Sequence, residues 1–334
     1  MKYLALLALL LTPAPALSEG LQARVEGDDA WVVYPGGDGP GKGKHIVFIA
    51  AEESYRSEES MPQMARILSK HGFKCTVLFG IDPKDGTINP MVKDNIPGLE
   101  ALASADLLVA FLRWRELPDD QMKRLIDYTE SGKPIVGLRN ATHPFKYAKR
   151  PDSPYAKYDS SSKDPQGGWG RQVLGETWVS HYAKNLVEST RCDAAGDHSI
   201  LKGIPKSFWI PDDVYGISTL HGDCTPILLG QPLVGWKPDD QPAEKKPIPI
   251  AWTKTYTGSA GKAARIFTST MGHGDAFKVE EFRRLIANGC YWAMGLEDKI
   301  DPKSALDLVG PYEPGPVGGK GLKKGVKPAD LILR

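Results

Sequence analysis

The feature that most constrains the fold is an alternation of short apolar runs and amphipathic segments between residues 45 and 138. The run 45–50 is almost continuously apolar, as strands are in parallel sheets that helices cover on both faces. Segment 60–71 follows it with apolar residues at helical spacing. Later runs predict three more strands and a second helix, at 75–79, 107–112, 134–138 and 119–131. This β-α-β order predicts an α/β fold with an open, mostly parallel sheet.

The pattern changes after this region. Residues 142–216 are rich in Pro, Gly, Ser, Asp and aromatic side chains, which predicts a functional loop insertion within the domain. Strand-like runs then return and a last helix follows, at 227–229, 248–253, 265–269 and 279–295. The tail 311–334 is rich in Gly, Pro and Lys, so we expect it to wrap the surface or to stay mobile. We therefore expect one domain over residues 45–310, preceded by a lead-in at 19–44.

The first 18 residues have the pattern of an export signal. Lys2 precedes a short apolar run, and small residues follow up to Ser18. The run is shorter than the roughly 20 apolar residues that a membrane-spanning helix needs, and no later stretch is long enough. We expect a cleaved signal peptide at 1–18, a periplasmic or secreted protein, and no membrane partner.

Charge and cysteine content narrow the class further. The chain has 42 Lys+Arg against 41 Asp+Glu, without the basic surplus that nucleic-acid binders show. The four cysteines fit no zinc or thioredoxin spacing. Cys75 and Cys290 lie in predicted core elements, whereas Cys192 and Cys224 lie in loop-rich sequence and could pair in an exported protein. The sequence does not indicate an oligomeric state.

Polar residues follow the predicted strands, where open parallel sheets bind their ligands. Those that we expect on one rim are Glu52, Glu53, Arg56, Arg113, Arg115, Arg139, Thr142, His143, Lys254, His273 and Asp275. Each alone is also typical of a solvated loop. The convergence of five strand ends is what indicates a site.

Two histidines of this set are candidates for general acid–base catalysis, because imidazole titrates near neutral pH. They are His143 and His273, and a structural hydrogen-bonding histidine is the alternative for each. Asp275 could orient His273 or cap the next helix. No Gly-x-Ser-x-Gly elbow and no phosphate-binding glycine loop follows a strand, so serine hydrolase and dinucleotide chemistry are not indicated.

The insertion offers two further kinds of ligand group. His181 and His221, with Glu176 and Asp213, could hold a divalent metal, although their spacing matches no metal motif. We predict no cofactor, and a divalent metal is the alternative that these residues leave open. Aromatic side chains such as Trp169 and Trp178 would suit the faces of a sugar ring; the alternative is a small core under a long loop.

Five segments together carry a resemblance to a known family: residues 45–53, 137–145, 265–273, 282–284 and 291–296. In sequence and in order they resemble the ThuA-like (trehalose utilisation) family of the class I glutamine amidotransferase-like superfamily. It implies a three-layer flavodoxin-like sandwich. In glutamine amidotransferases a nucleophilic cysteine sits at a sharp turn after a central strand. Here that turn carries Arg139-Asn140-Ala141, and the superfamily histidine at His273 cannot run thioester chemistry without a cysteine, so we expect no glutaminase activity.

The family's link to trehalose catabolism implies a small carbohydrate as partner. Dehydrogenases that make 3-keto sugars accompany the family, which suggests cleavage or isomerisation of an oxidised glycoside. His143 or His273 would then be the base, and Arg139 or Arg113 would stabilise an enolate-like oxygen. Glu52 or Asp275 would orient or protonate. The substrate-binding candidates are Glu53, Arg56, Arg113, Arg115, Thr142, Trp169, Trp178 and Lys254. A carbohydrate-binding protein without chemistry and a metal-dependent hydrolase are the alternatives.

Overall fold

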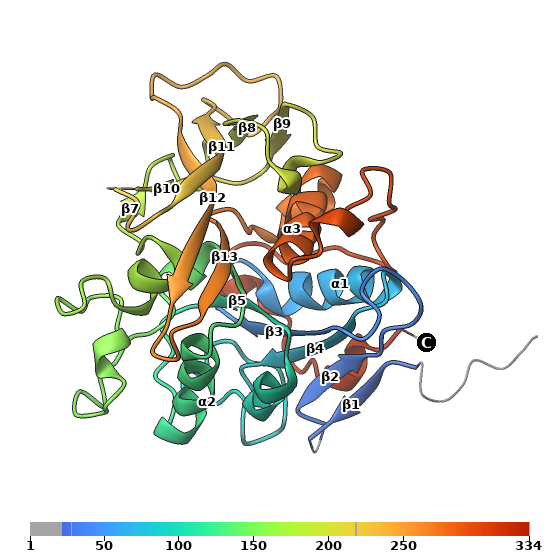
Figure 1. The fold of residues 1–334 in the computed structure, drawn as a ribbon, viewed down its shortest axis with the longest axis vertical. Coiled ribbons are helices and arrows are strands. Elements are labelled where there is room, and N and C mark those ends of the chain that lie inside the picture. Colours follow the sequence, from blue (N-terminus) through green and yellow to red (C-terminus); the bar gives the residue numbers. More distant parts are fainter. Residues whose placement is uncertain (1–21, 28, 218, 334) are drawn as a thin grey trace, which may run out of the picture.

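The computed structural model describes residues 22–27, 29–217 and 219–333, and a large mixed sheet runs through its whole length (Figure 1). The strands of this sheet are β1 (Arg24–Glu26), β2 (Trp31–Tyr34), β3 (His45–Ala51), β4 (Lys74–Phe79), β5 (Leu107–Leu112), β6 (Ile135–Leu138), β8 (Thr190–Ala194), β9 (Ser207–Ile210), β11 (Thr225–Pro232), β12 (Ile248–Thr257) and β13 (Ala263–Ser269). They lie in the order β1-β2-β4-β3-β5-β6-β13-β12-β11-β8-β9. The predicted signal peptide at 1–18 lies outside the described residues.

The five central strands are parallel and follow the order β4-β3-β5-β6-β13. Numbered along the chain, this is the 2-1-3-4-5 order of flavodoxin-like folds, which confirms the predicted α/β class. Antiparallel strands continue the sheet on both sides, with β1 and β2 at one end and β12, β11, β8 and β9 at the other. A separate two-stranded sheet pairs β7 (Ser180–His181) with β10 (Tyr215–Gly216).

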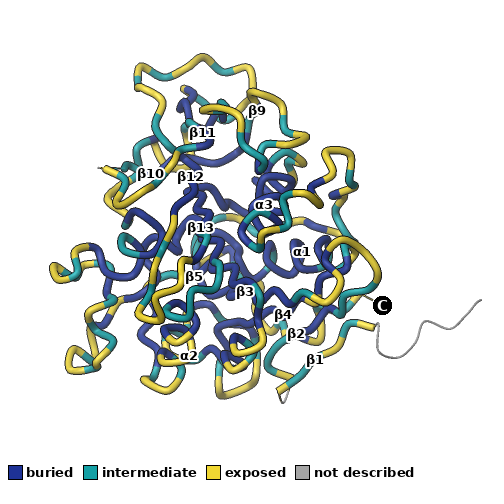
Figure 2. The backbone as a smooth tube through the Cα atoms, viewed as in Figure 1, coloured by how far each residue is buried: buried dark blue, intermediate teal, exposed yellow. Residues whose placement is uncertain are grey.

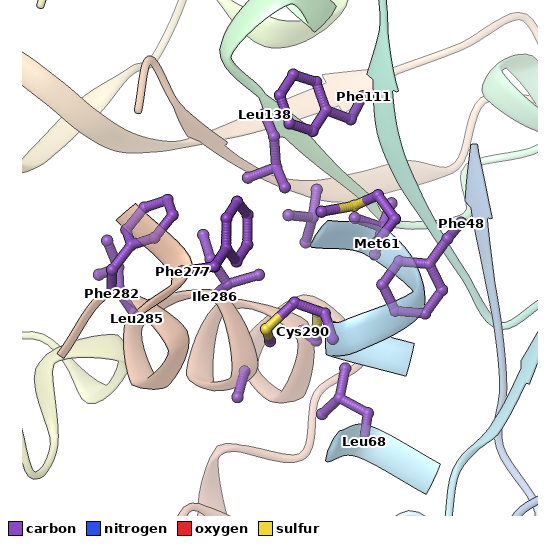
Figure 3. Packing of buried hydrophobic residues seen from close by; sticks show 14 of the residues in the cluster. Phe48, Met61, Leu68, Phe111, Leu138, Phe277, Phe282, Leu285, Ile286 and Cys290 are labelled. Carbon is purple, nitrogen blue, oxygen red and sulfur yellow. The ribbon is translucent and has the colours of Figure 1, made fainter. Parts of the chain in front are cut away.

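Helices cover both faces of the sheet and complete three layers. The helices α1 (Ser57–Lys70) and α3 (Glu280–Ala293) pack on one face, and α2 (Asp119–Glu130) packs on the other with a 3₁₀ helix at Leu99–Ser104. Strand β3 alternates between the two cores: Ile46 and Phe48 join the α1/α3 side, and Val47 and Ile49 join the α2 side. Figure 3 shows Phe48 of β3, Met61 of α1 and Ile286 of α3 within the core cluster between the two helices and the sheet.

Helix α1 begins at Ser57, three residues before the predicted start at Ser60. The carboxylate of Glu52 accepts the backbone N–H groups of Ser54 and Tyr55 at 2.7 Å and of Ser57 at 3.1 Å. These bonds satisfy donors that have no partner within a helix, and they place a negative charge at its positive end. The turn after β3 is therefore fixed by a side chain that we expected in the chemistry.

Strands also form where the sequence predicted connecting segments. β1 and β2 lie in the expected lead-in, and β8 and β9 lie in the expected loop insertion, because neighbouring strands supply their hydrogen-bond partners. The tail wraps the surface, one of the two alternatives expected for it. The hydroxyl of Tyr34 donates to the carbonyl of Leu331 at 3.0 Å, and the backbone N–H of Ile88 donates to the carbonyl of Val326 at 2.8 Å.

All four cysteines are free, so Cys192 and Cys224, whose pairing the sequence left open, form no disulfide. Cys192 is buried with its thiol 3.6 Å from the sulfur of Met271, whereas the Cys224 thiol donates to the carbonyl of His221. Figure 2 shows buried backbone through the centre of the sheet and exposed backbone in the outer loops. Within the described residues, no helix has the length and apolar character needed to cross a membrane.

We expect the α1/α3 core to set the stability of the fold. Ile286→Ala removes a fully buried side chain between α3 and the sheet, and it should lower the free energy of unfolding by about 2–5 kcal/mol. Urea denaturation measures this, with Val234→Ala as the control at an exposed position, where the change should stay within about 0.5 kcal/mol. Equal effects of the two substitutions would contradict this packing.

Candidate functional site

The carboxyl ends of β3, β5, β6 and β13 meet at one edge of the sheet and form the expected rim. Lys254 does not belong to it, contrary to the prediction. Strand β12 runs antiparallel to β13, and Lys254 pairs with Ile266 inside β13 rather than with its last residue, Ser269. Its ammonium donates to the carbonyl of Gln172 at 2.8 Å. The prediction failed because it assumed a parallel strand.

Arg139 occupies the turn directly after β6 and is fully buried. Its φ of 42° lies in the left-handed region, which a residue with a side chain rarely adopts. The Nη1 atom donates to Asp212 Oδ1 and the Nη2 atom donates to Asp213 Oδ1, both at 2.6 Å. The guanidinium carbon lies 3.8 Å from the ring centre of Tyr55 and 4.7 Å from that of Tyr215. These contacts occupy both terminal nitrogens, and the Nε atom is buried without a hydrogen-bond partner. The fully buried guanidinium is therefore not placed to stabilise a substrate oxygen, contrary to the prediction.

Each of the two carboxylates is also hydrogen-bonded to a histidine. Asp212 Oδ2 accepts the backbone N–H groups of Gly272 at 2.7 Å and of His273 at 2.8 Å. Asp213 Oδ2 lies 2.5 Å from His181 Nδ1. Burial would raise the pKa of Asp213, but Arg139 and His181 outweigh burial and hold it below the ordinary value. Asp213 is therefore ionised at neutral pH.

The partners of His181 and His143 fix where each imidazole carries its proton. A carboxylate can only accept, so His181 carries its proton on Nδ1, and Nε2 is the free atom. The hydroxyl of Thr142 donates to the carbonyl of Arg139, so it accepts from His143 Nδ1, 3.1 Å away. Burial, together with the positive charges of Arg113 and Arg139, holds the pKa of His143 well below its ordinary value.

His273 has the opposite tautomer. Its Nδ1 accepts the backbone N–H of Asp275 at 3.1 Å, which leaves the proton on Nε2. Burial lowers the pKa of His273, Asp212 opposes this, and Arg139 adds to it. His273 itself caps the short helix after β13, through this bond to the N–H of Asp275. The side chain of Asp275 is half exposed and lies 3.2 Å from Lys278 instead.

Two exposed indoles lie beside His143 and His181. Trp114 is 38% exposed and Trp178 is 36% exposed, and their ring centres lie 5.9 Å and 5.6 Å from that of His143. Trp178 lies 6.1 Å from His181, and Tyr215 contacts both histidines. Trp114 was not among the predicted site residues, although its place directly after β5 was the available signal. The cluster presents apolar ring faces beside the imidazoles of His143 and His181.

Glu53 gathers three cations next to this cluster. Its carboxylate lies 2.7 Å from Arg113, 3.1 Å from Arg115 and 2.6 Å from Lys93. Burial would raise the pKa of Glu53, but Arg113 and Lys93 outweigh it and lower the pKa. Arg115 is fully buried and otherwise donates to backbone carbonyls, so neither Glu53 nor Arg115 is free for a substrate. Arg113 keeps partial exposure, and its guanidinium stacks on Trp114.

Three other predicted site residues have structural partners. Glu52 caps α1 and is fully buried. Arg56 is fully buried and donates to the carbonyl of Gly318 at 3.2 Å. Trp169 lies in the α2-side core, with its indole N–H donating to Thr129, so it is not the exposed platform that we expected. The sequence could not show the burial of Arg56 and Trp169, because their partners Gly318 and Thr129 lie far along the chain. The partners of Glu52 are local, at two to five residues' distance.

The residues considered as alternative metal ligands do not form one shell. His181 binds Asp213, Glu176 pairs with Arg171 at 2.6 Å, and His221 is exposed. In the part of the chain that the structure describes, no group of three or more His, Cys, Asp or Glu side chains is placed to hold a metal ion.

Comparison with known proteins gives one family. The family model described as trehalose utilisation, ThuA, matches residues 44–293. A search of curated proteins found no match.

Among solved structures the likenesses are distant. A ThuA-like protein from Bacteroides uniformis is 16% identical with a TM-score of 0.49, over 80% of this chain and 96% of that one. One from Parabacteroides merdae is 14% identical with a TM-score of 0.49, over 76% and 90%. A glutamine amidotransferase from Thermotoga maritima is 12% identical with a TM-score of 0.34, over 78% and 87%.

Removing the buried guanidinium should be far more damaging than removing a surface one. Arg139→Met leaves two buried carboxylates without their cation, so we expect a loss of about 3–5 kcal/mol in the free energy of unfolding. Arg191→Met breaks the exposed pair with Asp193 and should cost at most about 1 kcal/mol. Denaturation of both variants side by side checks this, and an Arg139 variant as stable as the control would refute it.

Burial of neutral His143 should make stability depend on pH. Its folded pKa lies well below the unfolded value of about 6.5, so the unfolded chain binds a proton that the folded chain does not. Stability is therefore lost as pH falls below about 6.5. From about pH 7.5 to about pH 5.5, the wild type should lose about 1.4 kcal/mol more than His143→Gln. Parallel unfolding curves at both pH values would contradict the assignment.

Proposed function

The chain belongs to the ThuA trehalose utilisation family, and from this premise we propose that it acts on a glycoside by acid–base chemistry. The proposed substrate class is an uncharged glycoside oxidised to a 3-keto sugar. We further propose that the segment 1–18 exports the chain, which places this chemistry in the periplasm or the medium.

The observation that carries the proposal is the His181–Asp213 pair. An ionised carboxylate holds the Nδ1–H of His181 at 2.5 Å, and this fixes the ring and leaves Nε2 as a proton acceptor. Asp213 is itself held by Arg139, so the carboxylate cannot rotate away. Exposed Trp178 lies against the same imidazole. This arrangement is typical of a positioned general base beside a ring-binding surface.

The chemistry follows from the acidity of a carbon next to a ketone. His181 Nε2 takes the proton from C2 of the 3-keto sugar, and the electron pair moves onto the C3 oxygen as an enolate. The enolate then re-forms the ketone and expels the glycosidic oxygen from C1. His273 carries its proton on Nε2 and is the candidate donor to the departing oxygen. Addition of water to the resulting double bond completes a net hydrolysis.

Three side chains at or beside the rim fit the remaining requirements. Arg113 is partly exposed, and its Nη1 makes no hydrogen bond within the described part of the chain, so it can face the enolate oxygen. Trp114 and Trp178 offer exposed ring faces for the apolar face of a sugar. The ionised groups nearby are paired with one another, which suits an uncharged ligand.

The cysteines support the view that this is not a glutaminase. Arg139 holds the left-handed turn after β6, where an amidotransferase would need its nucleophile. Burial raises the pKa of the Cys224 thiol to about 11 and raises those of the other three thiols as well. A thiol needs a lowered pKa to act as a nucleophile at neutral pH.

A second candidate is a carbohydrate-binding protein without catalysis. The exposure of Trp114 and Trp178 favours it, because these rings would bind a sugar whether or not the histidines act on it. The two candidates differ in what the histidines contribute. Binding that survives loss of His181 is common to both, whereas turnover that requires His181 belongs only to the enzyme.

The test is turnover of trehalose, simple glucosides and their 3-keto forms, each with and without EDTA. We expect release of sugar from the keto forms alone, unaffected by EDTA, because no step above uses a metal. His181→Gln should lower the rate by about 10²–10⁴-fold, the usual contribution of a positioned base. His221→Gln is the matched control at an exposed histidine outside the cluster and should keep full activity.

Three results would count against the proposal. Full activity in the His181 variant would remove its central residue. Loss of turnover with EDTA would favour the metal-dependent alternative. Binding without turnover across the whole panel would favour the binding protein.

A further inference from the structure

The C-terminal segment 311–323, which we call the strap, lies against the turn that carries His273. Tyr312 is buried, and its hydroxyl donates to the carbonyl of Gly274 at 2.8 Å. A Cβ atom at Gly274 would lie only 2.8 Å from the Cβ of Pro314. Glycine at this position is therefore what allows the strap to lie directly on the turn.

The strap also holds the loop between β3 and α1. The amide of Gly318 donates to the carbonyl of Ser54 at 2.9 Å. Arg56 Nη2 donates both to the carbonyl of Gly318 at 3.2 Å and to that of Glu53 at 3.0 Å. Tyr55, whose ring covers the buried guanidinium, lies between these anchors. The strap thus fixes the second loop of the site as well as the first.

Further bonds attach the strap to the body of the protein. Glu59 on α1 accepts the amide of Gly315 at 2.9 Å, and its other oxygen pairs with Lys323. Lys278, at the end of the short helix after β13, lies 2.6 Å from Glu313. Because the strap is held at both α1 and this helix, it restrains the loops instead of moving with them.

We infer that the strap is part of the candidate site and that Tyr312 is a positioning residue for His273. The strap lies beyond residue 293, where the match to the family model ends. The inference rests on the proposed function only for the reaction that His273 would serve. The contacts themselves stand without it.

The environment of His273 gives the inference a measurable signature. The charged groups that face the imidazole are Asp212 and Asp213 after β9, Arg139 after β6, and Asp275 on the adjoining short helix. Burial outweighs the carboxylates and keeps the pKa of His273 below its ordinary value. If the Gly274 carbonyl loses its partner, the turn opens more often, water reaches the imidazole, and that pKa moves upward.

The experiment compares two substitutions that each remove one tyrosine hydroxyl bonded to the tail. Tyr312→Phe removes the bond to Gly274, whereas Tyr34→Phe, the control, removes the bond to Leu331, which belongs to neither loop. Backbone hydrogen exchange over residues 272–278 should become about fivefold faster in the first variant only, as expected for one lost hydrogen bond. Proton NMR titration of His273, assigned with His273→Gln, should show an upward pKa shift in the same variant.

The inference is overturned if Tyr312→Phe leaves both the exchange and the titration unchanged, or if Tyr34→Phe changes them equally. Neither readout needs a substrate. A wild-type chain that turns over no glycoside, but whose Tyr312 variant shows both effects, would contradict the proposed function and support the strap. A wild-type chain with full turnover, whose Tyr312 variant shows neither effect, would support the proposed function and contradict the role of the strap.

Discussion

The structure of the rim depends on one buried cation that two adjacent carboxylates share. Arg139 binds Asp212 and Asp213 through separate nitrogens. Asp213 in turn binds the imidazole of His181, and Asp212 accepts the backbone N–H of His273. Burying three charged groups is costly, and their attraction offsets that cost only when the geometry is well held. The left-handed turn after β6 and the tyrosine rings on the guanidinium supply that geometry. Loss of the cation would therefore release both histidines.

The site is shared between the parallel sheet and the segments added to it. The sheet supplies Arg139 and His143 after β6 and His273 after β13, as flavodoxin-like folds place ligand-binding residues. The insertion supplies the two carboxylates and His181. Asp213 of the insertion fixes the Nδ1–H tautomer of His181, whereas Thr142, in the turn after β6, fixes that of His143.

The sequence predicted the elements whose signal is local and missed those that depend on distant partners. The buried runs of the central strands predicted the fold and the rim, including His143 and His273. The direction of β12, which removes Lys254 from the rim, depends on pairing that no local pattern reveals. The burial of Trp169 likewise follows from a tertiary contact, its bond to Thr129. The bonds of Glu52 to the start of α1 are local, but a carboxylate after a strand is equally typical of a ligand-binding rim. His181 was identified only as a metal ligand, because its bond to Asp213 spans the insertion.

The most direct test of this account is the nitrogen-15 NMR measurement of the histidine tautomers in the full chain at about pH 8. The account predicts that His181 and His143 carry their protons on Nδ1 and that His273 carries its proton on Nε2. Single substitutions of each histidine assign the signals. An Nε2-protonated His181 would contradict the account, because the atom proposed to accept the substrate proton would already hold one.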